Sequence, residues 1–167
     1  YKTRFAISSN DDEIYDIGEI FYPNQNRPID KRSNGCKILR IDNKNIVKEL
    51  EYNFGFSIDK SKNGKPIIPI GFEQYFLLGL FDWDGCIYHK KGRNLRVSYC
   101  GNIHTLNVVS QIFKSILNIE FSLSKTTHSY ISIEGRELND NGICYTLQSK
   151  GLKDSIKILN YLYQNTD

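Results

Sequence analysis

The sequence predicts a mixed α/β (α+β) protein built from two similar units, each with a curved antiparallel sheet and helices on one side. Three observations support this prediction. Alternating strand patterns and amphipathic helical patterns follow one another along the chain, their order repeats with residues 3–21 matching 95–113, and one short apolar helix ends in two acidic residues. A chain of 167 residues can bury two small joined cores of this kind.

The first unit is predicted over residues 1–56. Residues 3–21 show an alternating strand followed by an amphipathic helix, for which Asn10 is the expected N-cap. Residues 36–54 show a second strand, a polar turn and a second helix. Acidic residues cluster on the first helix, so we expect that helix to lie on the side of the sheet away from any nucleic acid.

The second unit is predicted over residues 72–167, after a Pro- and Gly-containing linker at 57–71. It repeats the strand–helix–strand–strand–helix order of the first unit. The matched pairs at an offset of 92 are Arg4 and Arg96, Asn10 and Asn102, and Phe21 and Phe113. In the second block Cys36 is matched with Cys144 and Leu39 with Leu147. Chance patterning of strands and helices is the alternative, and the length of the matched blocks argues against it.

Composition narrows the classes of function. The net charge of +3 is only mildly basic, so the distribution of charge matters more than its sum. No apolar run approaches the roughly 20 residues that cross a bilayer, so no membrane partner is expected. The four cysteines are widely spaced and form no CxxC pair, which argues against a zinc site and for free thiols in a reducing compartment.

The most informative segment is FLLGLFDWDG at residues 76–85. Its leucines and phenylalanines would bury a helix, and Trp83 is expected to pack. Gly79 lacks a side chain, which would let another backbone approach closely. Asp82 and Asp84 follow at the helix end, and Gly85 is expected to be a flexible exit. We interpret two carboxylates at the end of a buried stripe as an arrangement for holding a metal ion, although such aspartates can also form a simple turn.

The nine residues LLGLFDWDG resemble the signature of the LAGLIDADG homing endonucleases. The identities are Leu77, Gly79, Leu80, Asp82, Asp84 and Gly85. A weaker resemblance extends over the link at 55–69. The resemblance implies a saddle of antiparallel strands on double-stranded DNA, two signature helices packed face to face at its centre, and site-specific, metal-dependent hydrolysis of phosphodiester bonds. The expected setting is an intron, an intein or a free-standing mobile gene, inside a bacterial or phage host or an organelle.

The resemblance also assigns roles to single residues. Asp84 matches the metal-binding catalytic aspartate, which would hold Mg²⁺ or another divalent cation. Lys60 is the candidate for an assisting catalytic lysine. The helix–helix interface is expected to contain Leu77, Gly79, Leu80 and Asp82.

Basic residues alternate with apolar ones on several predicted strands. This alternation predicts one core-facing and one basic sheet face, and the basic face is either merely solvated or lies along DNA, with cations meeting phosphates and base edges. The residues expected to contact DNA are Lys2, Arg4, Lys31, Arg32, Lys37, Arg40, Lys90, Lys91, Arg93 and Arg96.

A second signature helix would be needed to pair with the first. At an offset of 92 residues its position would precede Tyr1, and the sequence contains no methionine. We therefore expect the helix to come from an upstream segment, with a second chain as the other source. We expect the sequence to be a fragment, a processed piece or a protein that lost this helix.

Two alternatives to the endonuclease stay open. The first is a non-cleaving DNA- or RNA-binding protein of the same fold, such as a maturase or a regulator, which would keep the basic sheet without a second catalytic aspartate. The second is a protein-interaction module that docks through the stripe from Leu77 to Phe81.

Overall fold

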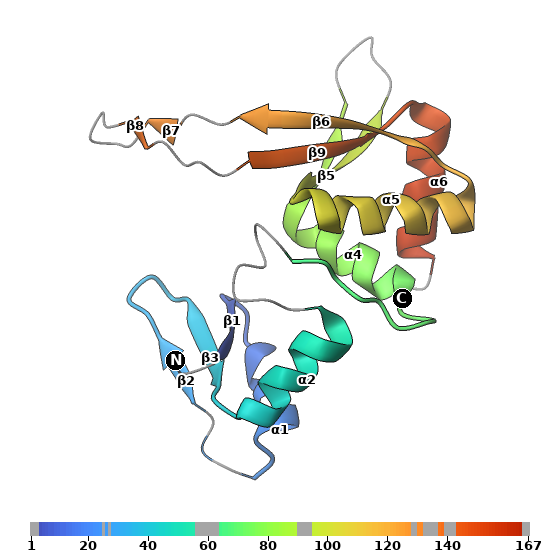
Figure 1. Ribbon diagram of the computed structural model, residues 1–167. Coiled ribbons are helices and arrows are strands. Elements are labelled where there is room, and N and C mark those ends of the chain that lie inside the picture. Colours follow the sequence, from blue (N-terminus) through green and yellow to red (C-terminus); the bar gives the residue numbers. More distant parts are fainter. Residues whose placement is uncertain are drawn as a thin grey trace. The chain divides into compact units, whose positions relative to one another are not determined.

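The computed structural model describes residues 4–24, 26, 28–55, 64–89, 95–127, 130–131, 137–138 and 143–164, and the structural statements below concern these residues. The chain divides into two compact units, Tyr1–Asn53 and Phe54–Asp167. Each unit combines helices with an antiparallel sheet (Figure 1). The predicted mixed α/β class with antiparallel sheets is therefore confirmed.

The first unit contains a three-stranded antiparallel sheet in the order β1-β3-β2. Its elements are β1 (Phe5–Ser9), α1 (Ile14–Phe21), β2 (Ile29–Lys31), β3 (Lys37–Ile41) and α2 (Lys44–Phe54), whose last residue falls in the second unit. Ile14 of α1 packs on Leu39 and Ile41 of β3 to form a small buried core. The N-cap of α1 is Glu13, without a side-chain cap bond, so the predicted N-cap role of Asn10 is wrong.

The second unit has a four-stranded antiparallel sheet in the order β4-β5-β9-β6. Its elements are α4 (Glu73–Asp84), β4 (Gly85–Tyr88), β5 (Arg96–Gly101), α5 (Ile103–Leu117), β6 (Phe121–Thr127), β9 (Ile143–Ser149) and α6 (Leu152–Tyr163), with a short hairpin of β7 (Tyr130–Ile131) and β8 (Glu137–Leu138). The order β5-β9-β6 has the same topology as β1-β3-β2, and α4 and β4 precede it.

Helix α5 has well-defined ends. The Asn102 side chain accepts a hydrogen bond from the backbone N–H of Thr105 at 2.9 Å, as predicted for an N-cap. At the other end Asn118 takes a left-handed conformation with φ of 54°, which lets its N–H close the last turn. Both ends of α5 are therefore closed by local hydrogen bonds.

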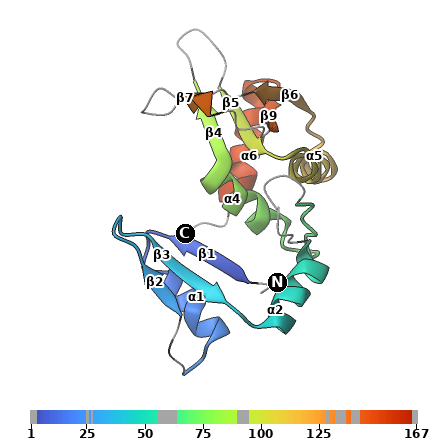
Figure 2. The same cartoon turned by 60° about the vertical axis from the view of Figure 1, so that its left-hand side comes forward.

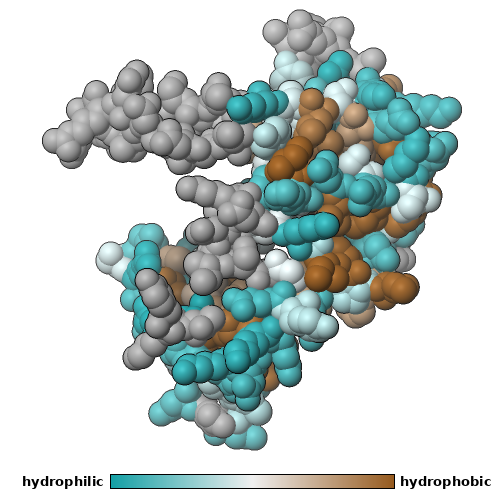
Figure 3. Space-filling model, viewed as in Figure 1, coloured by the Kyte–Doolittle hydropathy of each residue, from teal (hydrophilic) through white to brown (hydrophobic). Residues whose placement is uncertain are grey.

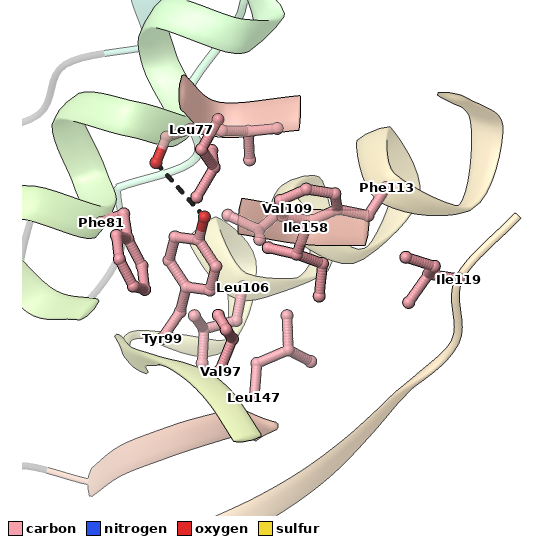
Figure 4. Close-up of a cluster of buried hydrophobic side chains, with 11 residues drawn as sticks. Leu77, Phe81, Val97, Tyr99, Leu106, Val109, Phe113, Ile119, Leu147 and Ile158 are labelled. Carbon is pink, nitrogen blue, oxygen red and sulfur yellow. Dashed lines mark hydrogen bonds between the residues drawn. The ribbon is translucent and has the colours of Figure 1, made fainter. Parts of the chain in front are cut away.

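The core of the second unit lies between the sheet and helices α4, α5 and α6 (Figure 4). Val97, Tyr99 and Leu147 point from the strands into this core, where they meet Leu77 and Phe113 among other helical residues. The Tyr99 hydroxyl donates to the carbonyl oxygen of Leu77 at 3.4 Å, and burial raises the pKa of this tyrosine well above its ordinary value. Helix α4 is thus attached to the sheet by packing and by a buried hydrogen bond.

In the part of the chain that the structure describes, every helix is too short or too polar to span a bilayer.

Candidate metal and nucleic-acid site

Helix α4 carries the signature segment and presents two different faces. Leu77 and Phe81, one turn apart, are 0% and 6% exposed and belong to the core. Tyr75 and Trp83, on the other side, are 65% and 75% exposed, and Gly79 lies exposed between them. The helix therefore buries one stripe in its own unit and leaves an apolar and aromatic stripe outside.

This placement corrects three predictions. Leu77 belongs to the core of its own unit and not to an external helix–helix interface, because full burial leaves it no accessible surface. The stripe from Leu77 to Phe81 is not exposed as a whole, because Leu77 and Phe81 are buried, and this leaves Gly79 as its exposed residue. Trp83 does not pack but projects into solvent. Of the remaining predicted interface residues, Gly79 and Asp82 are exposed and Leu80 is half-buried.

Gly85 links α4 directly to β4 (Figure 2). Its backbone is extended, with φ of −84° and ψ of 156°, so the chain does not use glycine here for a left-handed exit. A Cβ at this position would lie 2.2 Å from both the carbonyl oxygen and the ring of Phe81. Glycine is needed because the buried ring of Phe81 folds back over the end of its own helix.

Two exposed carboxylates stand at the end of α4. Asp82 accepts a hydrogen bond from the Tyr163 hydroxyl at 3.5 Å, and partial burial together with this carboxylate raises the pKa of Tyr163. Asp84 is the last residue of the helix and immediately precedes the edge strand β4. Carboxylate oxygens suit a hard divalent cation. Among the described residues, however, no three His, Cys, Asp or Glu side chains gather into a metal-binding group.

Asp84 also lies at the edge of an apolar groove of about 830 Å³ in the second unit. One wall comes from α4 and its N-cap, and includes Phe72, Tyr75, Phe76, Leu80 and Asp84. The segment before the helix contributes Pro66, Ile67, Ile68 and Pro69. Figure 3 shows hydrophobic side chains gathered at the surface of the second unit. The groove joins an apolar surface to a carboxylate at the end of the helix.

The sheet of the second unit has an open face on the side away from its helices. Because side chains alternate along a strand, residues next to the core positions Val97, Tyr99 and Leu147 point to this face. Arg96 is the one predicted DNA-binding residue found there within the described chain. The sequence prediction for this face included only cations. The neutral residues on the same face are Cys86, Tyr88, Ser98, Cys100, Ser122, Ser124, Cys144, Thr146 and Gln148.

The cations of the first unit do not share one face, in contrast to the sequence prediction. Lys37 forms an ion pair with Asp12 of the loop before α1 at 3.0 Å, and the Lys31 ammonium lies 5.7 Å from the ring centre of Tyr15 in α1. Both lysines therefore lie on the helix side of the sheet. The strand register explains this placement. Lys37 lies two residues before the core residue Leu39, so both side chains point to the same face, and Lys31 is paired with Lys37 across the strands.

Arg4 and Arg40 occupy the other side of the first sheet, and each contacts an aspartate. The Nε of Arg4 lies 2.5 Å from an Asp42 carboxylate oxygen, and Arg40 is paired with Asp30. Arg32 is exposed in the turn between β2 and β3. The other predicted site residues, Lys2, Lys60, Lys90, Lys91 and Arg93, lie outside the described residues.

The exposure of Gly79 leads to a testable expectation. A Cβ at Gly79 would meet no atom within 4 Å, so Gly79→Ala should improve helix propensity without a clash. We expect the free energy of unfolding to rise by about 0.5–1 kcal/mol, measured by urea denaturation followed by circular dichroism.

Gly71→Ala is the matched control. Gly71 also has open space around its Cβ position, but its φ of +88° is unfavourable for alanine. The free energy of unfolding of Gly71→Ala should be lower by about 1 kcal/mol. Destabilisation by Gly79→Ala as well would show that a second copy of the chain packs against this glycine in solution, since the described residues leave its Cβ position open.

The order of elements, the sheet topology and the position of the signature helix define a LAGLIDADG-type fold. Comparison with solved structures agrees. The homing endonuclease I-DmoI in complex with DNA and Mn matches with a TM-score of 0.52 and 17% identity, over 98% of this chain and 82% of that chain. Its complex with DNA and Ca matches with a TM-score of 0.50 and 16% identity, over 98% and 76% of the two chains.

A second kind of protein shares the fold. The N-terminal LAGLIDADG domain of DUF199/WhiA matches with a TM-score of 0.50 and 15% identity, over 95% of this chain and 71% of that chain. A scan against protein-family models finds no match, and neither does a search of curated proteins. The similarity to solved structures therefore rests on the fold.

Proposed function

We propose that this chain belongs to a site-specific double-stranded DNA endonuclease that uses a divalent metal ion. The observation that supports the proposal most is the position of Asp84, which is exposed at the end of the signature helix and directly precedes the sheet with the open polar face. The solved complexes of I-DmoI contain DNA together with Mn or Ca, in keeping with this chemistry.

The chain's own groups would have separate roles in such a reaction. Asp84 would hold Mg²⁺ or another divalent cation, which supplies an activated water and charge neutralisation at a DNA phosphate. The open face of the sheet would position the duplex, with Arg96 as its described cation. Lys60 keeps its proposed assisting role.

Asp84 alone would bind Mg²⁺ weakly, so the proposal includes a second helix that carries another aspartate. The exposed stripe of α4, with Gly79 at its centre and Tyr75 and Trp83 on either side, is the surface on which that helix would pack. Its aspartate would then stand beside Asp84. An upstream segment or a second chain would supply it.

DNA binding by itself is tested through its salt dependence. For about four phosphate contacts, the affinity for a duplex should fall roughly a hundredfold between about 50 and about 200 mM salt, because bound cations displace condensed counterions. Fluorescence anisotropy with a labelled duplex measures this fall. A salt-independent affinity would overturn the DNA-binding proposal and favour a protein-interaction module.

A non-cleaving nucleic-acid-binding protein of the same fold is the second candidate. The observation that favours it is that the described residues form no group of three metal ligands around Asp84, because binding through the sheet needs no metal. Such a protein would bind DNA with an affinity that depends steeply on salt, and it would not cleave the strands in Mg²⁺ or Mn²⁺.

A further inference from the structure

The open face of the second sheet has an unusual composition for a surface that binds a polyanion. Its described residues are mostly neutral and small, with hydroxyl, thiol and amide groups, and none of them is acidic, although Ser98 among them is only 7% exposed. Cations contribute affinity for phosphate, whereas base edges are distinguished by directed hydrogen bonds from side chains, among which arginine on guanine is the commonest contact. The face is therefore suited to reading bases more than to holding the backbone.

Arg96 is held in place on this face by a neutral partner. Its guanidinium donates to the side-chain oxygen of Gln148 on the neighbouring strand β9 at 2.8 Å. The two arginines on the open side of the first sheet are instead paired with aspartates. A glutamine orients the guanidinium without neutralising it, so Arg96 keeps its full charge and fork geometry for a ligand.

The distribution of aromatic side chains indicates a duplex and not a single strand. Single strands are bound by aromatic rings on which successive bases stack. Tyr88, on the edge strand, is the aromatic residue of the open face among the described positions, while Tyr99 and Tyr145 point to the core side. A sheet with small side chains can instead enter a major groove about 12 Å wide.

We propose that Arg96 recognises one guanine through its O6 and N7 atoms in the major groove, and that Gln148 is the positioning residue for that contact. Guanine is the base that matches two parallel N–H donors. The proposal rests on the DNA-binding function proposed above and adds the identity of one base.

The test is selection from a pool of randomised DNA duplexes, followed by sequencing of the bound fraction. The wild-type chain should select guanine at one position. Arg96→Met keeps the aliphatic stem and removes the donors, so the preference for guanine there should fall by about 5- to 150-fold while preferences at other positions persist. Gln148→Met should weaken the same preference several-fold and no other.

Lys125→Met is the matched control. Lys125 is an exposed cation of the same sheet, but it opposes Tyr145 and lies on the other face. Its substitution should leave the base profile unchanged. Circular dichroism confirms that each variant is folded.

Three outcomes overturn the inference in distinguishable ways. A uniform loss of affinity for all sequences, with a salt slope lower by about one, would make Arg96 a phosphate contact. A base profile that neither variant changes would remove both residues from recognition and leave the proposed function intact. A wild-type chain that binds no duplex would overturn the proposed function itself.

Discussion

Asp84→Asn is expected to abolish metal-dependent DNA cleavage and to leave DNA affinity nearly unchanged. Asparagine has the size of aspartate but lacks its negative charge, and the metal contributes several kcal/mol of transition-state stabilisation that depends on that ligand. The cleavage rate should therefore fall by at least about a hundredfold. Because Asp84 is exposed and stands at the helix end, the substitution should not disturb the core.

The measurement is cleavage of a duplex enriched by binding selection, in Mg²⁺, in Mn²⁺ and in EDTA. Asp82→Asn is the matched control, since it removes a carboxylate two residues away that accepts the Tyr163 hydroxyl. We expect this control to keep most of the activity. Undiminished cutting by Asp84→Asn would refute the proposed metal ligand. Duplex binding by the wild-type chain without any cutting would favour the non-cleaving binder.

Phe113→Ala is expected to cause the largest loss of stability. Phe113 is fully buried, and its ring centre lies 6.0 Å from that of Tyr99, 5.4 Å from Phe121 and 6.3 Å from Tyr161. Removing it leaves a cavity where α5, α6 and the sheet meet. Truncations of this kind cost about 3–5 kcal/mol, which is comparable to the stability of a small domain.

Urea denaturation followed by circular dichroism measures this loss, and it should appear as a shift in the transition of the second unit. Phe21→Ala is the matched control, because Phe21 occupies the equivalent position in the repeat but is only half-buried. The loss of stability caused by Phe21→Ala should be clearly smaller than the loss caused by Phe113→Ala. Equal losses for the two variants would show that the two cores contribute equally to stability, contrary to the larger core seen around Phe113.

Much of the fold could be predicted because local patterns repeat. The order of strands and helices followed from periodicity, and the N-cap at Asn102 followed from residue type. Its counterpart Asn10 did not cap a helix, because α1 starts later, at Ile14, with Glu13 as its N-cap. Equivalent residues in a repeat thus share a topological position without sharing every local contact.

The candidate site was predicted less completely. The signature motif located Asp84 at the end of a helix, because the spacing from the buried Phe81 to the carboxylate is local. The motif did not show that Leu77 belongs to the core or that Trp83 is exposed, since the whole signature segment is rich in apolar residues. Only the packing of α4 on the sheet decides which of its two apolar stripes is buried.

Short-range periodicity was enough to predict the mixed α/β class, the repeated order of elements and a helix that ends near Asp84. The tertiary structure decided which side chains share a surface. Lys31 and Lys37 lie toward α1, while Arg96 meets Gln148 from a strand far along the chain. Strand register sets these outcomes, because a shift of one residue moves every side chain to the opposite face of the sheet.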